Sequence, residues 1–381
     1  MRPSPASVMA LVALAAPAAP LHLGAQASDA LYDRFNALSG GEFRRYAFDS
    51  GIGIKSITQW SLPLVLVTPV GRSISVDLTS YFVSGRVETY GGGDSSKQTL
   101  SGLTDTQLRV LYTLRRDRAV ASLSFNLPTG RHSLSTSQSQ VNGAVGSNYL
   151  SFPVSSLGTA FGVTGGLAYA QQAGSWNLGF SGSLRYLASY EPFSDQSVSY
   201  SPGVEVRIRA GADRLLGRSA RLLLGLTTST FSSDLFTGTG TITGGTYRPG
   251  VRFIGDLAYL RVIGRSTLSL AAWDFYRLAG DTNSASNPET KENVLNAELR
   301  FAHPVASRLQ LEPMVGFRQW SPADYRGGRL YAAGLTARYG INDRLSASVS
   351  GRLDTGWVNS RGLGFAHLTG SGFTLWVRYQ R

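Results

Sequence analysis

The chain has 381 residues, 44 of them glycine, no cysteine and a formal net charge of +12. The lack of cysteine excludes disulfide bridges and thiolate metal sites. Hydrophobic residues make up 42% of the chain, which is low for a bundle of membrane-spanning helices. The basic residues are scattered over turns and alternating segments instead of lying on one helix. Nucleic acid is therefore not expected as a partner.

The N-terminus carries the three parts of a secretory signal peptide in the right order. Arg2 supplies the positive charge, residues 8–20 form a short apolar stretch, and Ala25-Gln26-Ala27 offers small residues to a signal peptidase. The apolar stretch is shorter than the ~20 residues that a spanning helix needs. We expect residues 1–27 to be cleaved off during export.

The segment that follows has a different pattern. Leu31, Phe35 and Leu38 recur at helical spacing, and Ser28 or Asp29 can cap the start of a helix. The interpretations that remain open are a short helix in a barrel mouth and a periplasmic tail. We assign residues 28–43 to this N-terminal segment and residues 44–381 to a barrel.

About fourteen later segments alternate apolar and polar residues over roughly ten positions. In residues 345–353, Leu345, Val349 and Leu353 point to one side, whereas Ser348 and Arg352 point to the other. This repetition, in an exported chain rich in glycine, predicts an all-β fold. We expect a transmembrane up-and-down antiparallel β-barrel with lipid outside and a polar lumen inside.

Connections of two lengths separate these segments. Short Gly-, Pro- or Asn-containing turns suit periplasmic hairpins, and longer polar stretches suit extracellular loops. Seven short turns join fourteen strands, the C-terminal segment 368–380 adds one, and residues 44–54 supply a first strand. The count is therefore about sixteen strands, or fourteen if residues 44–54 belong to a plug. The short turns are residues 69–72, 115–118, 172–175, 216–219, 263–266, 304–307 and 341–344.

The alternation also assigns charged side chains to the lumen. Two interpretations stay open: a pore lining that selects solutes by charge, or ion pairs that fill the interior. The candidate lumen-lining residues are Glu205, Arg207, Arg209, Glu298, Arg300, Glu312, Arg338, Arg352 and Asp354, with Arg318 beside them.

Aromatic residues near the expected strand ends suggest girdles at the membrane interfaces. These are Trp60, Trp176, Tyr186, Trp273, Tyr276, Trp320, Tyr331, Tyr339, Trp357, Trp376 and Tyr379.

The sequence offers little chemistry. It has no nucleophile elbow, P-loop or paired-histidine metal spacing, so we expect no catalytic, cofactor-binding or metal-binding residues. The one enzymatic alternative is a lipid hydrolase in which His367 activates Ser371 at the barrel rim. The four-residue spacing departs from the pattern of such enzymes, which place the two residues two apart or on neighbouring strands.

Four stretches carry a resemblance: SFNLPTGRHSL (124–134), LGTAFGVTGGLAYA (157–170), SYEPF (189–193) and YSPGVEVRIRAGAD (200–213). They resemble two families, the outer-membrane long-chain fatty acid and aromatic hydrocarbon transporters and the outer-membrane barrels of phenol meta-degradation operons. The match covers about 90 residues and rests on Gly and Pro turn chemistry. It implies a barrel that passes a hydrophobic solute, and it assigns no ligand-binding residue.

The expected function is passive or facilitated passage of a small solute across the outer membrane of a diderm bacterium, and the resemblance implies a hydrophobic one. The expected partners are outer-membrane lipid, the barrel assembly machinery and that solute. The alternatives are a non-conducting structural or adhesive barrel and the lipid-modifying enzyme. Loop 129–156 is long enough to fold inward and constrict a pore.

Overall fold

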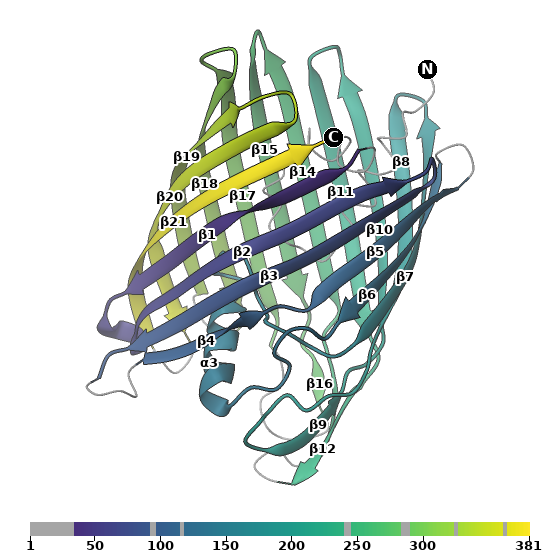
Figure 1. The fold of residues 1–381 in the computed structure, drawn as a ribbon. Helices are drawn as coiled ribbons and strands as arrows, with labels where there is room; N and C mark the ends of the chain where they lie inside the picture. The colour runs from purple at the N-terminus through teal and green to yellow at the C-terminus, as the bar shows by residue number, and fades with distance from the viewer. Residues whose placement is uncertain are drawn as a thin grey trace.

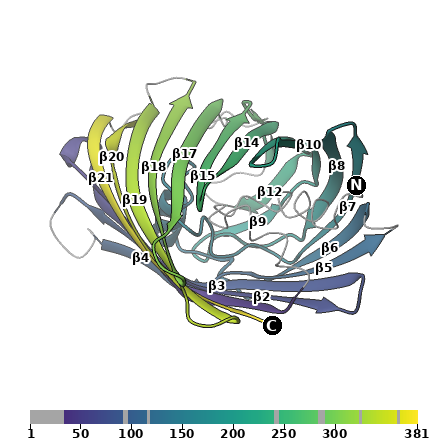
Figure 2. The same ribbon diagram turned by 90° about the horizontal axis from the view of Figure 1, so that it is seen from above.

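The computed structural model describes residues 34–91, 97–114, 118–239, 245–282, 290–323, 327–360 and 364–381. The expected signal peptide and Leu31 lie outside these residues. The described strands form one closed antiparallel barrel of sixteen strands. Figures 1 and 2 show the barrel from the side and from above. The strands are β1 (Asn36–Phe48), β2 (Ile54–Val70), β3 (Ile74–Thr89), β4 and β5 (Lys97–Leu103 and Thr106–Leu114), β6 (Ala119–Leu127), β7 (Gly162–Ala173), β8 (Trp176–Leu187), β10 (Glu205–Leu216), β11 (Ala220–Phe231), β14 (Arg252–Ile263), β15 (Ser266–Arg277), β17 (Glu292–Pro304), β18 (Leu309–Pro322), β19 (Gly327–Gly340), β20 (Leu345–Ser360) and β21 (Gly364–Gln380).

β4 and β5 count as one wall strand because both pair with β3. β4 pairs with Phe82–Glu88 and β5 with Ile74–Thr79. The interruption falls at Thr104, whose hydroxyl accepts a hydrogen bond from the Tyr81 amide at 3.0 Å. Asp105 follows Thr104 and lies between the two strands, so its carboxylate can bind a loop.

The barrel closes where its first and last strands meet. β1 pairs with β21 from Asn36↔Gln380 to Phe48↔Leu368. The first strand therefore begins at Asn36, eight residues before the expected start of the barrel. From that point on, both interpretations left open for residues 28–41, a short helix and a periplasmic tail, are wrong. The segment forms a strand despite its helical spacing of apolar residues, because pairing with β21 supplies the backbone hydrogen bonds that close the sheet.

Short turns and long loops lie at opposite ends, as expected. Gly71, Gly174, Gly217 and Gly264 have φ values of 75°, 60°, 70° and 60° in the short turns, a conformation that favours glycine. The other end carries the 3-10 turn η1 (Ser50–Ile52), helix α3 (Thr136–Val145) and a small sheet, all away from the C-terminus (Figure 1). The strands of that sheet are β9 (Ser197–Ser201), β12 (Asp234–Thr239), β13 (Gly245–Arg248) and β16 (Asp281–Thr282).

The outer face of the barrel is apolar. Ile208 and Leu353 keep 63% and 69% of their surface exposed, whereas Arg209 and Asp354 beside them are buried on the inner face. The alternation therefore assigned these faces correctly. Among the described residues, no helix is long and apolar enough to cross a membrane.

Half of the expected tryptophan girdle is wrong. Trp60 and Trp357 point outward. Trp273, Trp320 and Trp376 point inward, as shown by their pairing with inward residues on neighbouring strands. Trp273 pairs with Asn296, Trp320 with Val294 and Trp376 with Ser348. These three rings pack in the lumen, where Trp320 stacks on Tyr149 at 5.6 Å.

The two faces of β20 provide a matched test of membrane contact. Val349 is outward and exposed, and Ser348 is inward. We expect Val349→Arg to impair barrel assembly, because an arginine on the lipid face costs up to about 2–4 kcal/mol, with the largest cost at the midplane. Ser348→Arg should assemble like the parent. The yield of heat-modifiable folded protein in the outer-membrane fraction measures both, and equal yields would mean that this face does not meet lipid.

Candidate functional site

The lumen-lining residues expected from the alternation all lie on the inner face of the barrel. Pairing fixes this, because directly opposed residues of an antiparallel sheet share a face. They form two groups on different parts of the wall. Glu298, Arg300, Glu312, Arg338, Arg352 and Asp354 lie on β17–β20, whereas Glu205, Arg207 and Arg209 lie on β10.

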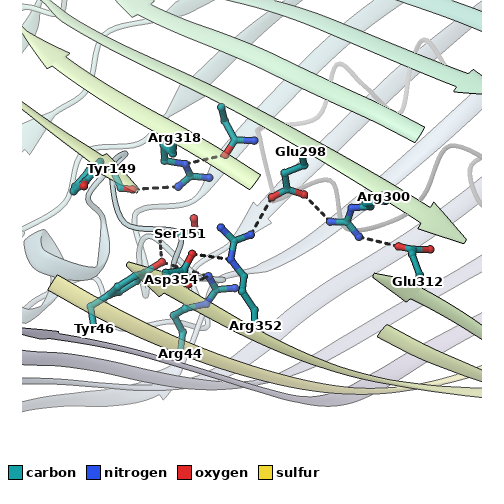
Figure 3. Close-up of polar contacts among 11 residues, drawn as sticks. Arg44, Tyr46, Tyr149, Ser151, Glu298, Arg300, Glu312, Arg318, Arg352 and Asp354 are labelled. Atoms are coloured by element: carbon teal, nitrogen blue, oxygen red, sulfur yellow. Dashed lines mark hydrogen bonds and ion pairs between the residues drawn. The ribbon is translucent and has the colours of Figure 1, made fainter. Parts of the chain in front are cut away.

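The first group forms a continuous row of ion pairs, here called the ladder. Glu312 accepts from Arg338 at 3.1 Å and from Arg300 at 3.1 Å. Arg300 also binds Glu298 at 2.7 Å. Each of these carboxylates lies between two guanidinium groups, as Figure 3 shows for Glu298.

The ladder continues to the seam of the barrel. Arg352 joins Glu298 at 3.0 Å to Asp354 at 2.8 Å. Asp354 also lies 3.7 Å from Arg44 on β1 (Figure 3). The Asp354 side chain has no exposed surface, so its charge depends on these two arginines.

Glycines on the intervening strands let long side chains lie flat on the wall. A Cβ at Gly372 would lie 3.0 Å from the Nε of Arg44. Across the barrel, a Cβ at Gly225 would overlap the ion pair between Arg209 and Asp256. These glycines leave room for charges to pair across neighbouring strands.

The second group also consists largely of paired charges. Arg207 donates to Glu205 at 2.6 Å, and Arg209 forms a bidentate pair with Asp256 at 2.6 and 2.9 Å. The Arg209 side chain is only 4% exposed. Arg209, one of the expected lining residues, therefore contributes more to the structure of the wall than to the water-exposed lumen.

Two arginines that the sequence reasoning did not select face the lumen near Glu205. Arg185 on β8 approaches Glu205 at 3.8 Å, and its side chain is 38% exposed. Arg252 at the start of β14 lies over the Phe231 ring at 4.7 Å. The sequence could have identified Arg185 as inward, because it alternates with Ser181 and Ser183. Arg252 begins its strand, so no alternating residues precede it.

A long loop enters the lumen at the end that carries α3. Residues 128–161 connect β6 to β7, and we call them the plug. Ser135 and Gln138 form a capping box at the start of α3. Val141, Val145, Leu150 and Phe152 are buried in one apolar cluster with inward residues of the wall. The expectation that this loop folds inward is confirmed.

The wall beneath the plug consists of neighbouring strands around the barrel seam. It contributes Tyr46, Val83, Leu100, Leu330 and Leu368 from β1, β3, β4, β19 and β21. Figure 1 shows α3 beside β4. Among the described residues, no side chain of β7–β15 belongs to this cluster. The apolar part of the plug thus packs on one side of the barrel.

Buried hydrogen bonds fasten the plug to that wall. Gln59 on β2 donates to the Val154 carbonyl at 2.7 Å and accepts from the Val154 amide at 3.0 Å. Arg318 donates to the Tyr149 carbonyl at 3.2 Å. Each bond satisfies a backbone group that has left the sheet, and losing it would leave a buried polar group unpaired.

The ladder and the plug touch at Tyr46. Its hydroxyl accepts from Arg44 at 3.3 Å and from the Ser151 amide of the plug at 3.3 Å (Figure 3). Through Arg44, the plug is thereby coupled to Asp354.

Acidic side chains hold the neck and the helix of the plug. Asp105 accepts from the Gly130 and Thr159 amides at 3.1 and 2.7 Å, which binds both ends of the loop to one carboxylate. Asp195 accepts from the Thr136 amide and hydroxyl at the start of α3. These bonds lower the pKa of Asp195 below its ordinary value, so the carboxylate stays charged at neutral pH.

The residues of the enzymatic alternative do not assemble. His367 and Ser371 lie four residues apart on β21, and no hydrogen bond joins them in the described part of the chain. A different pair, Ser266 Oγ and His303 Nδ1, lies at 2.7 Å, but Ser266 is buried. The described residues also contain no cluster of three or more potential His, Cys, Asp or Glu metal ligands.

No family model and no curated protein matches the sequence. Solved structures of outer-membrane barrels are similar in fold. Outer-membrane expressed OmpT of Vibrio cholerae is 11% identical (91% of this chain and 97% of that chain covered, TM-score 0.42). A Pseudomonas aeruginosa FadL homologue is 10% identical (91% and 90%, TM-score 0.46). An anion-selective porin from Comamonas acidovorans is 12% identical (91% and 98%, TM-score 0.44).

This similarity is too low to indicate a solute for the chain. The closed barrel has an apolar outer face and a charged interior, and these two features identify it as a membrane-spanning barrel without the comparisons. The chain is an outer-membrane β-barrel.

Proposed function

We propose that the barrel lets small polar solutes, preferentially anions, cross the outer membrane along the part of the lumen that the plug leaves uncovered. The observation that carries this proposal is the charged inner wall of a sixteen-stranded barrel. Barrels of this size leave an aqueous channel, whereas eight-stranded barrels fill with side chains. Arg185 and Arg338, whose side chains are 38% and 41% exposed, project into that space.

The sign of the wall favours anions. Every basic side chain on the inner face of the described strands is an arginine, and arginines outnumber carboxylates there by four. A lumen with a positive excess concentrates anions. The inward arginines are Arg44, Arg109, Arg185, Arg207, Arg209, Arg221, Arg252, Arg277, Arg300, Arg318, Arg338, Arg352 and Arg378. The inward carboxylates are Glu42, Asp77, Glu205, Asp213, Asp256, Glu292, Glu298, Glu312 and Asp354.

The charged wall supports a polar solute over the hydrophobic one that the sequence resemblance implies. An apolar molecule would gain nothing from guanidinium and carboxylate groups that keep their water. The larger buried apolar cluster of the lumen lies under the plug, and a smaller one lies on the inner faces of β2 and β5–β7. A non-conducting structural barrel is the alternative, and it would leave the exposed arginines without a role.

Planar bilayer recording tests the proposal. We expect the purified protein to conduct and its reversal potential in a KCl gradient to indicate chloride preference. Arg185→Ser with Arg338→Ser should reduce that preference at least twofold, because both charges face water and Glu205 and Glu312 each keep another arginine. Arg218→Ser with Arg265→Ser, in exposed short turns, removes the same charge outside the lumen and should change it less. An absence of conductance would favour the structural alternative.

A further inference from the structure

Arg185 and Arg252 have few protein partners for their guanidinium groups. Arg185 has one ion pair, at 3.8 Å, and no hydrogen bond among the described residues. Arg252 makes only its contact with the Phe231 ring in that part of the chain, and its Nε is buried without a hydrogen-bond acceptor. By contrast, Arg209 is saturated by Asp256 and Thr227. An arginine carries five N–H donors, so most of those on Arg185 and Arg252 are available to a ligand.

The two guanidinium groups converge on the same part of the wall. That of Arg185 lies beside Glu205 on β10, and that of Arg252 lies over Phe231 on β11. Glu205 and Phe231 are direct partners across these adjacent strands. Side chains of directly opposed residues lie roughly 5 Å apart at Cβ, so both guanidinium groups lie over one cross-strand pair.

The surrounding charges leave this position positive. Glu205 is the carboxylate in direct contact with Arg185, and Arg207 already binds it at 2.6 Å. Asp105 acts on Arg185 from a greater distance, and its oxygens are occupied by the neck of the plug. Arg248 adds a further cation, since its Nε donates to the Phe231 carbonyl at 3.0 Å. Asp234 lies near the same group of side chains and accepts from the Tyr200 hydroxyl and the Gly203 amide. A mobile anion thus meets several guanidinium groups, whereas the nearby carboxylates already have partners in the protein.

We propose that Arg185 and Arg252 form a binding station for a small oxyanion, a carboxylate or a phosphate, on the wall outside the apolar cluster of the plug. Guanidinium groups recognise both chemistries through paired, charge-assisted N–H···O bonds, which a chloride ion cannot accept in the same way. The Phe231 ring holds Arg252 in place, so little side-chain freedom is lost when the anion binds. The station deepens the proposed function, because an anion that passes the lumen would pause there.

Bilayer conductance in acetate, benzoate, phosphate and chloride tests the station. We expect the conductance of the parent protein to saturate with at least one oxyanion and to rise almost linearly with chloride. Arg185→Ser with Arg252→Ser should raise the half-saturating concentration at least tenfold. Arg185→Lys with Arg252→Lys keeps both charges but loses the planar donors, so it should keep the anion preference and still bind the oxyanion more weakly. The difference between the carboxylate and phosphate arms identifies the ligand class.

Two controls separate the station from the proposed function. Arg218→Ser with Arg265→Ser should leave saturation unchanged. Calorimetric titration of the detergent-solubilised barrel with benzoate and with phosphate measures binding even if the protein does not conduct. Conductance that rises linearly with every anion, with no heat of binding, overturns the station but leaves passage intact. Lysine variants that saturate like the parent overturn it too. Heat of binding that the serine variant loses, in a protein that does not conduct, supports the station and defeats passage.

Discussion

Removing the plug should raise single-channel conductance several-fold. The plug places an apolar cluster and a ten-residue helix inside the lumen, against one wall of a barrel wide enough for an aqueous channel. Conductance through a water-filled pore grows with its open cross-section. This change should therefore exceed the effect of any single substitution in the lumen.

The structure supplies the ends of the deletion. A Cβ at Gly158 would lie 2.8 Å from the Arg131 carbonyl, so the two limbs of the loop touch at its neck. Joining Arg131 directly to Leu157 removes residues 132–156 and spares Gly130 and Thr159, which bind Asp105. The barrel strands lose none of their pairing, and a folded, heat-modifiable product is expected.

A milder variant addresses the same point without shortening the chain. Gln59→Leu removes both hydrogen bonds to Val154 and leaves the backbone of the plug unsatisfied in a buried position. Losing such a partner costs roughly 1–3 kcal/mol, so the plug should open intermittently and appear as conductance noise. Quiet conductance at the parent level in both variants would mean that the plug does not limit the pore.

The wall of the barrel was predictable from the sequence because period-two alternation is local. Leu353 and Asp354 are neighbours, and their polarity alone assigned one to lipid and the other to the lumen. The girdle prediction failed for Trp320 because it rested on proximity to the strand end, whereas alternation with Glu312 and Arg318 places this ring inward. Its pairing with the inward Val294 agrees with that alternation.

Contacts between distant segments were beyond the sequence pattern. The length of loop 129–156 indicated that it can fold inward, but its attachment to Gln59 and Arg318 joins segments about 95 and 169 residues apart. The start of β1 was displaced for a related reason, because its partner is the C-terminal strand. Charge alternation likewise identified Arg209 as inward but gave no sign that Asp256 neutralises it, or that Arg252 has no acidic partner.

Neutralising Asp354 should destabilise the barrel more than any other single charge change in the ladder. Its side chain has no exposed surface, and it serves both Arg352 and Arg44. Arg352 keeps Glu298 when Asp354 becomes asparagine, but Arg44 loses its carboxylate while its Nε is already buried without an acceptor. Removing one member of a buried pair costs about 3–5 kcal/mol, because the remaining charge stays buried without a counter-charge.

Asp354→Asn should therefore unfold at a lower urea concentration than the parent in lipid vesicles. Asp343→Asn, in an exposed short turn, is the matched control and should unfold like the parent. Adding Arg44→Met to Asp354→Asn removes the stranded cation and should recover part of the loss. The coupling through Tyr46 to Ser151 gives a second readout, since Asp354→Asn should also increase conductance noise from the plug. If Asp354→Asn and Asp343→Asn unfold at the same urea concentration, the ladder contributes charge to the lumen without stabilising its wall.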